Sequence, residues 1–83
     1  MKLSIRYFAS IREALGQSLE SVDTSATTLG GLRDELIARG GAYAQALARG
    51  KAVRLALNQV MVDESAALIE GAEVAFFPPV TGG

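Results

Sequence analysis

Hydrophobic and polar residues alternate in several short stretches of the chain, and this alternation predicts β-strands. In the first stretch, Leu3, Ile5 and Tyr7 share one side, which is typical of a strand with one buried face. The predicted strands cover residues 2–8, 18–22, 52–58, 60–62 and 73–77. The first two lie close enough in the sequence to pair antiparallel.

A helical spacing of apolar residues follows Thr28, which is placed to cap the N-terminus of the main helix. The apolar stripe consists of Leu29, Leu32, Leu36 and Ile37. Gly40 and Gly41 supply the stop signal. Gly30 and Gly31 in the first turn each cost roughly 0.5–1 kcal/mol relative to alanine. They indicate either a frayed start or a close approach of another backbone, and we expect fraying.

Two shorter helical segments complete the pattern. Ser10 is predicted to cap a short helix, with Glu13 reaching back to close a capping box and Gly16 ending the helix. Residues 42–50 are predicted to contain one more short helical stretch.

The order of elements is therefore strand, short helix, strand, helix and then further strands. This order favours a mixed sheet of about five strands with one main helix packed on one face, an α+β roll. Eighty-three residues suffice for one compact domain and are too few for two. We expect a single domain over residues 1–83, in which residues 78–83 form an extended, flexible C-terminal tail.

Composition and charge exclude several classes of function. Eight Lys and Arg against nine Asp and Glu give a net charge of −1 without a basic run, so no nucleic-acid partner is expected. No apolar stretch suits a signal peptide or a membrane span, which predicts a cytoplasmic protein without a membrane partner. Cysteine and histidine are absent, which removes thiolate nucleophiles, imidazole bases and the usual zinc ligands, so no metal site is expected.

No residue of the chain has the setting of a general acid or base. Arg12, Glu13, Asp34 and Glu35 occupy positions suited to helix capping and solvated helix faces, and we expect structural roles for them. Catalytic groups should therefore belong to other proteins, and we expect no independent catalytic activity from this chain.

Three large apolar side chains lie out of phase with the buried sides of their strands. Phe8 is out of phase with Tyr7, Met61 with its flanking valines, and Phe77 with Phe76. All three should face away from the main helix. Together they predict a docking patch for a protein partner. A patch beside a flexible tail lets the partner hold the domain while the tail reaches a second site.

The chain ends in a segment whose composition predicts an extended arm: Pro78, Pro79, Val80, Thr81, Gly82 and Gly83. The prolines withhold ladder donors and so end the last strand. Two glycines without Cβ atoms can thread a channel of a partner enzyme that is too narrow for other residues. The terminal carboxylate of Gly83 is ionised at neutral pH and resists nucleophilic attack. Adenylation by ATP would activate it, after which sulfur or an amine could take the acyl carbon.

Three stretches together resemble one known family. They are YFASIREALG at residues 7–16, LALNQ at residues 55–59 and EVAFFPPVTGG at residues 73–83. With them the chain resembles, nearly from end to end, the small sulfur-carrier subunits of molybdopterin synthase, which belong to the ubiquitin-like β-grasp group. One departure is Ala72, which follows Gly71 where the family normally has Asp, and it affects at most a turn hydrogen bond.

This resemblance implies a β-grasp (ubiquitin-like) roll and a role in molybdenum cofactor biosynthesis. It implies that an E1-like activating enzyme uses ATP to adenylate Gly83, which then becomes a thiocarboxylate. The large synthase subunit would receive it and convert cyclic pyranopterin monophosphate to molybdopterin, with two carriers flanking a large-subunit dimer. A sulfurtransferase or cysteine desulfurase would supply sulfur indirectly, and the chain would bind no cofactor. Phe8, Met61 and Phe77 coincide with the partner surface of this family.

Other functions remain open at this point. The related carrier of the thiamine-thiazole pathway also ends in two glycines but generally lacks the FFPPVTGG ending. A ubiquitin-like protein modifier would use Gly83 to form amide bonds with lysines of its targets, and a dual-use carrier would do both. A plain interaction module would carry an inert tail.

Overall fold

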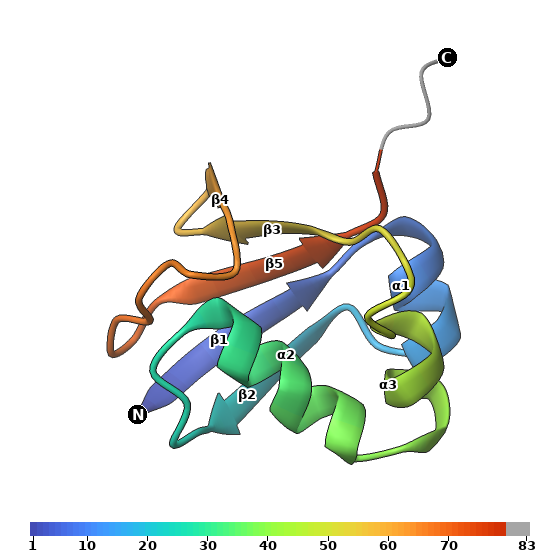
Figure 1. Ribbon diagram of the computed structural model, residues 1–83, viewed down its shortest axis with the longest axis horizontal. Helices are drawn as coiled ribbons and strands as arrows, with labels where there is room; N and C mark the ends of the chain where they lie inside the picture. Colours follow the sequence, from blue (N-terminus) through green and yellow to red (C-terminus); the bar gives the residue numbers. More distant parts are fainter. Residues whose placement is uncertain (80–83) are drawn as a thin grey trace.

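The computed structural model describes residues 1–79, which form a five-stranded sheet and three helices. The strands are β1 (Lys2–Tyr7), β2 (Leu19–Asp23), β3 (Arg54–Leu57), β4 (Val60–Val62) and β5 (Glu73–Phe77). The helices are α1 (Ala9–Leu15), α2 (Leu29–Ala38) and α3 (Gly41–Ala46). The order along the sheet is β2-β1-β5-β3-β4 (Figure 1). The predicted strands are confirmed, with ends that differ by one or two residues.

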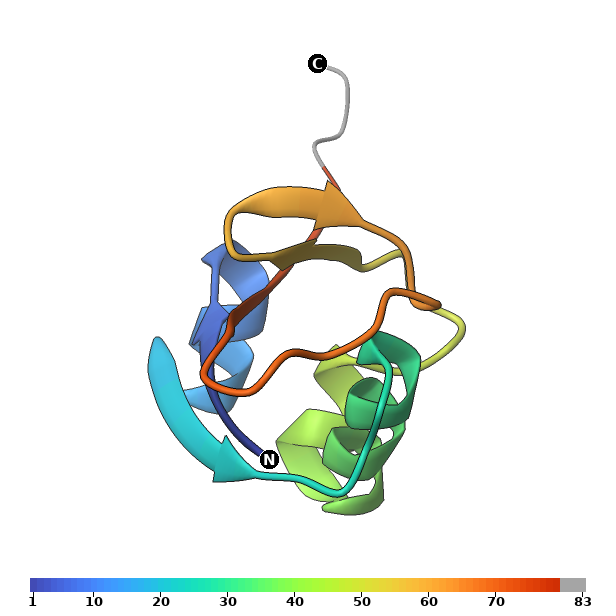
Figure 2. The ribbon, with the colours of Figure 1, turned by 90° about the vertical axis from the view of Figure 1, so that its left-hand side faces the viewer.

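The sheet is mixed because β1 and β5 run parallel to each other at its centre. β2 pairs antiparallel with β1, and β3 pairs antiparallel with both β5 and β4. The sheet curls from β2 to β4, and α2 lies on its concave side (Figure 2). α1 and α3 pack together at the end of the sheet where β1 and β5 finish (Figure 1). The predicted α+β roll with one main helix on one face is therefore confirmed.

The main helix packs on the inner face of the sheet through its predicted apolar stripe. Leu29, Leu32 and Leu36 are buried, and Ile37 packs against the core while it stays partly exposed. The sheet contributes inward side chains from three strands: Leu3, Ile5, Tyr7, Leu55, Val74 and Phe76. Burial of an aliphatic side chain of this size contributes roughly 1.5–3 kcal/mol. The two layers are thus held together mainly by the hydrophobic effect.

The start of α1 differs from the prediction. The helix begins at Ala9, Phe8 is its N-cap residue, and no side chain caps it, so the capping box of Ser10 and Glu13 does not form. The reason is that the chain turns directly from β1 into the helix through a left-handed backbone at Ala9, with φ 49°. Ser10 therefore lies inside the first turn instead of before it. The other end agrees with the prediction, because Gly16 ends the helix in the left-handed conformation.

The start of α2 confirms one prediction and corrects another. The hydroxyl of Thr28 accepts a hydrogen bond from the N–H of Gly31 at 3.1 Å, so the predicted cap forms. Gly30 does not fray: it is buried, and its N–H donates to the carbonyl oxygen of Glu64 at 2.9 Å. A Cβ at Gly30 would lie 3.2 Å from both the Cβ and the carbonyl oxygen of Glu64. The close approach of the segment after β4 therefore explains the glycine.

Candidate functional site

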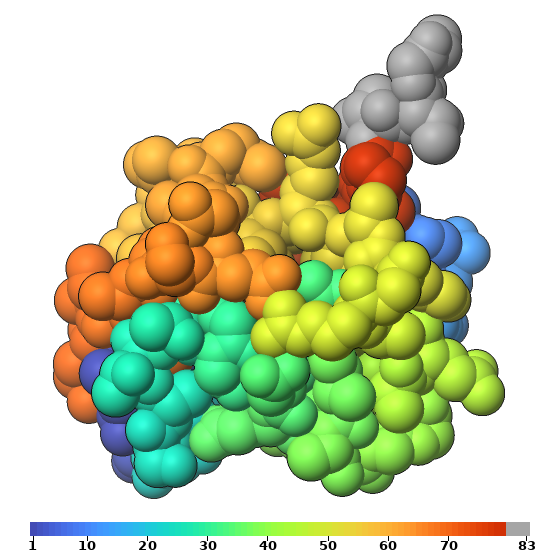
Figure 3. Space-filling model, in the orientation of Figure 1, coloured from blue at the N-terminus to red at the C-terminus, as the bar shows by residue number. Residues whose placement is uncertain are grey.

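The last strand leads directly to the start of the predicted tail. β5 ends at Phe77, and the half-buried Pro78 and Pro79 follow it. Because prolines have no N–H group, they cannot donate to a continuing ladder. The last described residues stand at the edge of the molecule, between α1 and the segment before β3 (Figure 3). The other predicted tail residues, Val80, Thr81, Gly82 and Gly83, lie outside the described residues.

Two of the three predicted patch residues lie together at the base of this tail. The rings of Phe8 and Phe77 pack edge to face, with centroids 6.0 Å apart and planes at 90°. The side chain of Phe8 is 40% exposed, and that of Phe77 is partly exposed. With Ala9 and Pro78 they line an open, mostly apolar hollow of about 390 Å³. The predicted outward orientation of both rings is therefore confirmed.

Met61 lies farther along the same face of the sheet. It is 50% exposed, and in the strand register it pairs with Ala56, which in turn pairs with Ala75 of β5. Ala75 precedes Phe77 by two residues, so their side chains point to the same side. The outer patch, defined as Phe8, Met61 and Phe77, therefore has an aromatic pair at one end, a methionine at the other, and small side chains between.

A polar cluster on the inner side was not predicted from the sequence. The Glu20 carboxylate accepts hydrogen bonds from Tyr7 Oη at 2.9 Å, Tyr43 Oη at 2.8 Å and Gln17 Nε2 at 3.0 Å, and it pairs with Arg39. Burial acts to raise the pKa of Glu20, but the bonds from Arg39 and the two tyrosines outweigh burial and hold the pKa below its ordinary value. Burial raises the pKa of Tyr7, so its hydroxyl remains protonated. The cluster links β1 and β2 to α3, through Tyr43, and to the end of α2, through Arg39.

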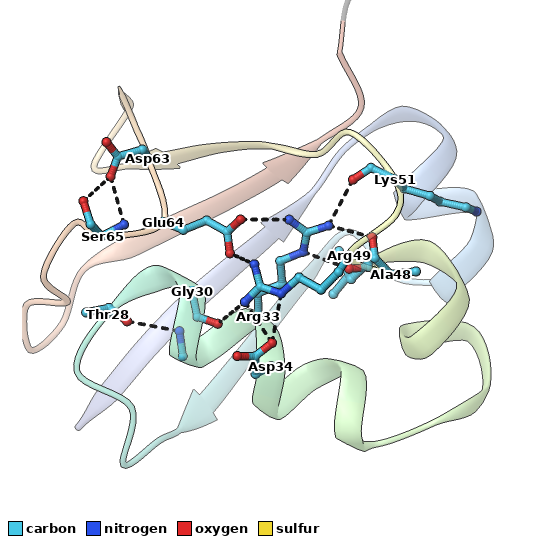
Figure 4. A network of polar contacts seen from close by, with 12 residues as sticks. Thr28, Gly30, Arg33, Asp34, Ala48, Arg49, Lys51, Asp63, Glu64 and Ser65 are labelled. Carbon is cyan, nitrogen blue, oxygen red and sulfur yellow. Dashed lines mark hydrogen bonds and ion pairs between the residues drawn. The ribbon is translucent and has the colours of Figure 1, made fainter.

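A second unpredicted network is centred on a buried arginine of α2 (Figure 4). Arg33 is 3% exposed, and its guanidinium donates to three carbonyl oxygens, those of Leu47, Ala48 and Lys51, at 2.8, 2.7 and 3.1 Å. Its third nitrogen lies 3.3 Å from a carboxylate oxygen of Glu64. These bonds fasten the loop between α3 and β3 to the main helix. The only sequence signal was a charged residue beside the apolar stripe, which does not distinguish a buried arginine from a solvated one.

Arg49 extends this network across the surface. It donates to Asp34 Oδ1 at 2.8 Å and to the carbonyl oxygen of Gly30 at 3.0 Å, and it pairs with Glu64. Asp34 thus takes part in an ion pair on the exposed side of α2. Figure 4 shows these side chains between α2 and the loops before β3 and after β4, on the side of the sheet that α2 covers.

These features define a class of protein. A curled sheet in the order β2-β1-β5-β3-β4, with α2 in its concave side, is a ubiquitin-like β-grasp domain. The chain belongs to the ThiS family, whose profile matches residues 5–83.

The relatives within this class support the family assignment. The molybdopterin synthase sulfur carrier subunit of Escherichia coli (strain K12) is 40% identical over 81 residues, which cover 98% of this chain and 99% of the relative. SAMP1 from Haloferax volcanii matches the fold with a TM-score of 0.77 at 27% identity, covering 100% of both chains. The protein–protein complex of subunits 1 and 2 of molybdopterin-converting factor from Helicobacter pylori contains a chain that matches with a TM-score of 0.69 at 25% identity and full coverage of both. The resemblance seen in the sequence is confirmed.

Proposed function

We propose that this chain is the sulfur carrier of a molybdopterin synthase and that Gly83 carries the sulfur. The full-length similarity to the Escherichia coli sulfur carrier subunit is the observation on which this proposal rests. The fold supports it, because β5 runs into Pro78 and Pro79 beside an exposed aromatic pair. The domain would thus present its own C-terminus to a partner that grips the adjoining surface.

The chemistry of the carboxylate suggests how loading would proceed. A Gly83 carboxylate oxygen would attack the α-phosphate of ATP and displace pyrophosphate, giving an acyl adenylate. The terminal sulfur of a persulfide on the sulfur-donating protein would then displace AMP to give an acyl disulfide, and a second thiol would attack its outer sulfur, forming a disulfide with the donor and leaving the thiocarboxylate on Gly83. In the large synthase subunit, this sulfur would bond to a carbon of cyclic pyranopterin monophosphate, and water would then cleave the bond between the sulfur and the acyl carbon of Gly83, so that the carrier would return to its carboxylate form. Adenylation is required because a free carboxylate resists nucleophilic attack.

The partners would divide the work as follows. An E1-like activating enzyme binds the ATP, a sulfurtransferase or cysteine desulfurase provides sulfur, and the large subunit supplies the catalytic groups of the transfer. The outer patch of Phe8, Met61 and Phe77 is the surface that these proteins would contact. The carrier itself would bind no cofactor and would be the sulfur-donating subunit of a two-subunit transferase without catalytic activity of its own.

We place this work in the cytoplasm, where the ATP for adenylation is available. Over residues 1–79, the helices are all too short or too polar to cross a bilayer.

The test is mass spectrometry of the chain isolated from its native cells. The proposal expects a form in which one sulfur replaces one oxygen at Gly83. It also expects that amidation of Gly83, or one extra residue after it, abolishes sulfur transfer while the melting temperature stays the same, because the core is untouched. Sulfur transfer by the amidated chain would refute the proposal.

A second candidate function is conjugation to other proteins. The match to SAMP1, a small archaeal modifier protein, is the observation that favours it. This function predicts Gly-Gly remnants on lysines of target proteins in digests of native cells. The thiamine-pathway carrier is less well supported, because the Escherichia coli relative is a carrier for molybdopterin synthase.

A further inference from the structure

Ala9 has a backbone conformation that residues with a Cβ rarely adopt. Its φ is 49°, in the left-handed region, where glycine is favoured and alanine is strained. Within residues 1–79, the other non-glycine residues with positive φ are Asn58 and Gln59. These two form the turn between β3 and β4, where two-residue hairpin turns ordinarily need this conformation. Ala9 lies at a junction between a strand and a helix, where no hairpin turn requires it.

The residue before it, Phe8, has a fully engaged backbone. Its N–H donates to the carbonyl oxygen of Phe76 at 3.1 Å, which continues the pairing of β1 with β5. Its carbonyl oxygen accepts from the N–H groups of Ile11 and Arg12 at 3.1 and 3.3 Å, which starts α1. One residue thus ends a strand and caps a helix. The sharp change of direction that this requires occurs at Ala9.

The consequence for the Phe8 side chain is that it stays outside the core. Although its backbone is fixed between β5 and α1, its ring is 40% exposed and meets the ring of Phe77 edge to face. Ala9 lines the same hollow as Phe8, Phe77 and Pro78. A glycine would adopt this φ without strain, but it would lack the methyl group that borders the hollow and would have far more conformational freedom.

We propose that Ala9 is a positioning residue for the outer patch. Its left-handed backbone and its methyl group hold the Phe8 ring against Phe77 before a partner binds. This inference rests on the proposed function, because it takes the large synthase subunit as the protein that docks on the patch. A ring that is ordered in advance removes the cost of ordering it on binding, which corresponds to about a twofold to tenfold gain in affinity.

The test is Ala9→Gly in the full-length chain, with two measurements. Titration calorimetry with the purified large subunit of the same organism should show an affinity about twofold to tenfold below that of the wild type. The melting temperature should not fall, since glycine relieves the strain at this φ. The matched control is Ala42→Gly on the exposed side of α3, which should lower the melting temperature slightly and leave the affinity unchanged.

Two results would overturn the inference. If Ala9→Gly binds the large subunit with wild-type affinity, the left-handed turn only reverses the chain direction and does not influence the outer patch. If the melting temperature of Ala9→Gly falls further than that of Ala42→Gly, the role of Ala9 is to stabilise the fold and not to position the patch. Phe8→Ala and Phe77→Ala keep this test separate from the proposed function. If both bind the large subunit weakly while Ala9→Gly binds normally, the positioning role alone fails; if both bind normally, docking on the patch fails as well.

Discussion

The two faces of the sheet each carry one aromatic pair, and both pairs come from the same two adjacent segments of chain. On the inner face, the rings of Tyr7 and Phe76 stack with centroids 6.1 Å apart and are buried. On the outer face, Phe8 and Phe77, the very next residues, pack edge to face at 6.0 Å; Phe8 is exposed and Phe77 is partly exposed. Because successive side chains of a strand point to opposite faces, one step along the chain separates a pair that stabilises the fold from a pair available to a partner.

The difference lies in what surrounds each pair and not in its chemistry. The inner rings belong to the buried core, where Tyr7 also meets Tyr43 of α3 edge to face, and the Tyr7 hydroxyl is bonded to Glu20 at 2.9 Å. The outer rings meet Ala9 and Pro78 at the start of the tail. Under the proposed function, the doublet Phe76-Phe77 would serve two purposes, folding and docking, and substitutions at the two adjacent positions should separate them.

The largest expected effect is that of Phe76→Ala. Removal of a fully buried ring leaves a cavity, and the free energy of unfolding should fall by about 3–5 kcal/mol. Denaturant unfolding at neutral pH measures this loss. Because so large a loss can unfold a small domain, Phe76→Leu serves as the milder variant, with a smaller fall in the same direction. A change below 1 kcal/mol in both variants would contradict the assignment of the inner face.

The next effect is that of Glu20→Gln, which tests the polar support of the inner pair. Loss of charge-assisted bonds from Arg39 and the tyrosines should lower the free energy of unfolding by about 1.5–3 kcal/mol at pH 7. Because the pKa of Glu20 is lowered in the folded chain, its contribution is complete above the unfolded pKa of about 4.3 and is lost as the pH falls through the folded pKa.

The stability curves of the wild type and of Glu20→Gln should therefore converge in acid. Denaturant unfolding from pH 7 down to pH 2 measures the difference. Phe77→Ala should keep the acid dependence of the wild type, because the outer pair has no bond to this carboxylate. A constant difference between the wild type and Glu20→Gln at all pH values would contradict the assigned pKa direction.

Phe77→Ala tests the outer pair and should affect binding more than folding. Its affinity for the large synthase subunit should fall about tenfold, which corresponds to about 1.4 kcal/mol, because exposed aromatic anchors carry much of the binding energy of an interface. The free energy of unfolding should change by less than in Phe76→Ala. Calorimetric titration and denaturant unfolding of the same sample give both numbers. A collapse in stability with unchanged affinity would reverse the roles of the two faces.

Strand phase alone predicted this division, since Phe8, Met61 and Phe77 were each assigned to the outer face by counting residues from their buried neighbours. Local signals also predicted the Thr28 cap and the glycine at the end of α1 correctly. These features depend on residues within a few positions of each other, and such short-range chemistry can be read along the chain.

Features that depend on distant residues were missed. Gly30 was expected to fray, but it faces Glu64, which is brought there by the path of the chain after β4. Glu64 also pairs with Arg33. No periodic pattern in the sequence indicates that this arginine is buried. The Ser10 capping box failed because the turn from β1 into α1 is made by a left-handed alanine, and alanine carries no sequence signal for that conformation.

The smallest expected effect is that of Met61→Ala, which shows how far the docking role extends from the aromatic pair. Met61 is half exposed on an edge strand, and Ala56 and Ala75 separate it from Phe77. Residues at the rim of an interface contribute little when truncated, so the affinity for the large subunit should fall by less than about threefold. Val60→Ala, the exposed neighbour that points to the opposite side, is the control and should leave the affinity unchanged. A loss as large as that of Phe77→Ala would place Met61 in the centre of the interface and extend the docking surface across three strands.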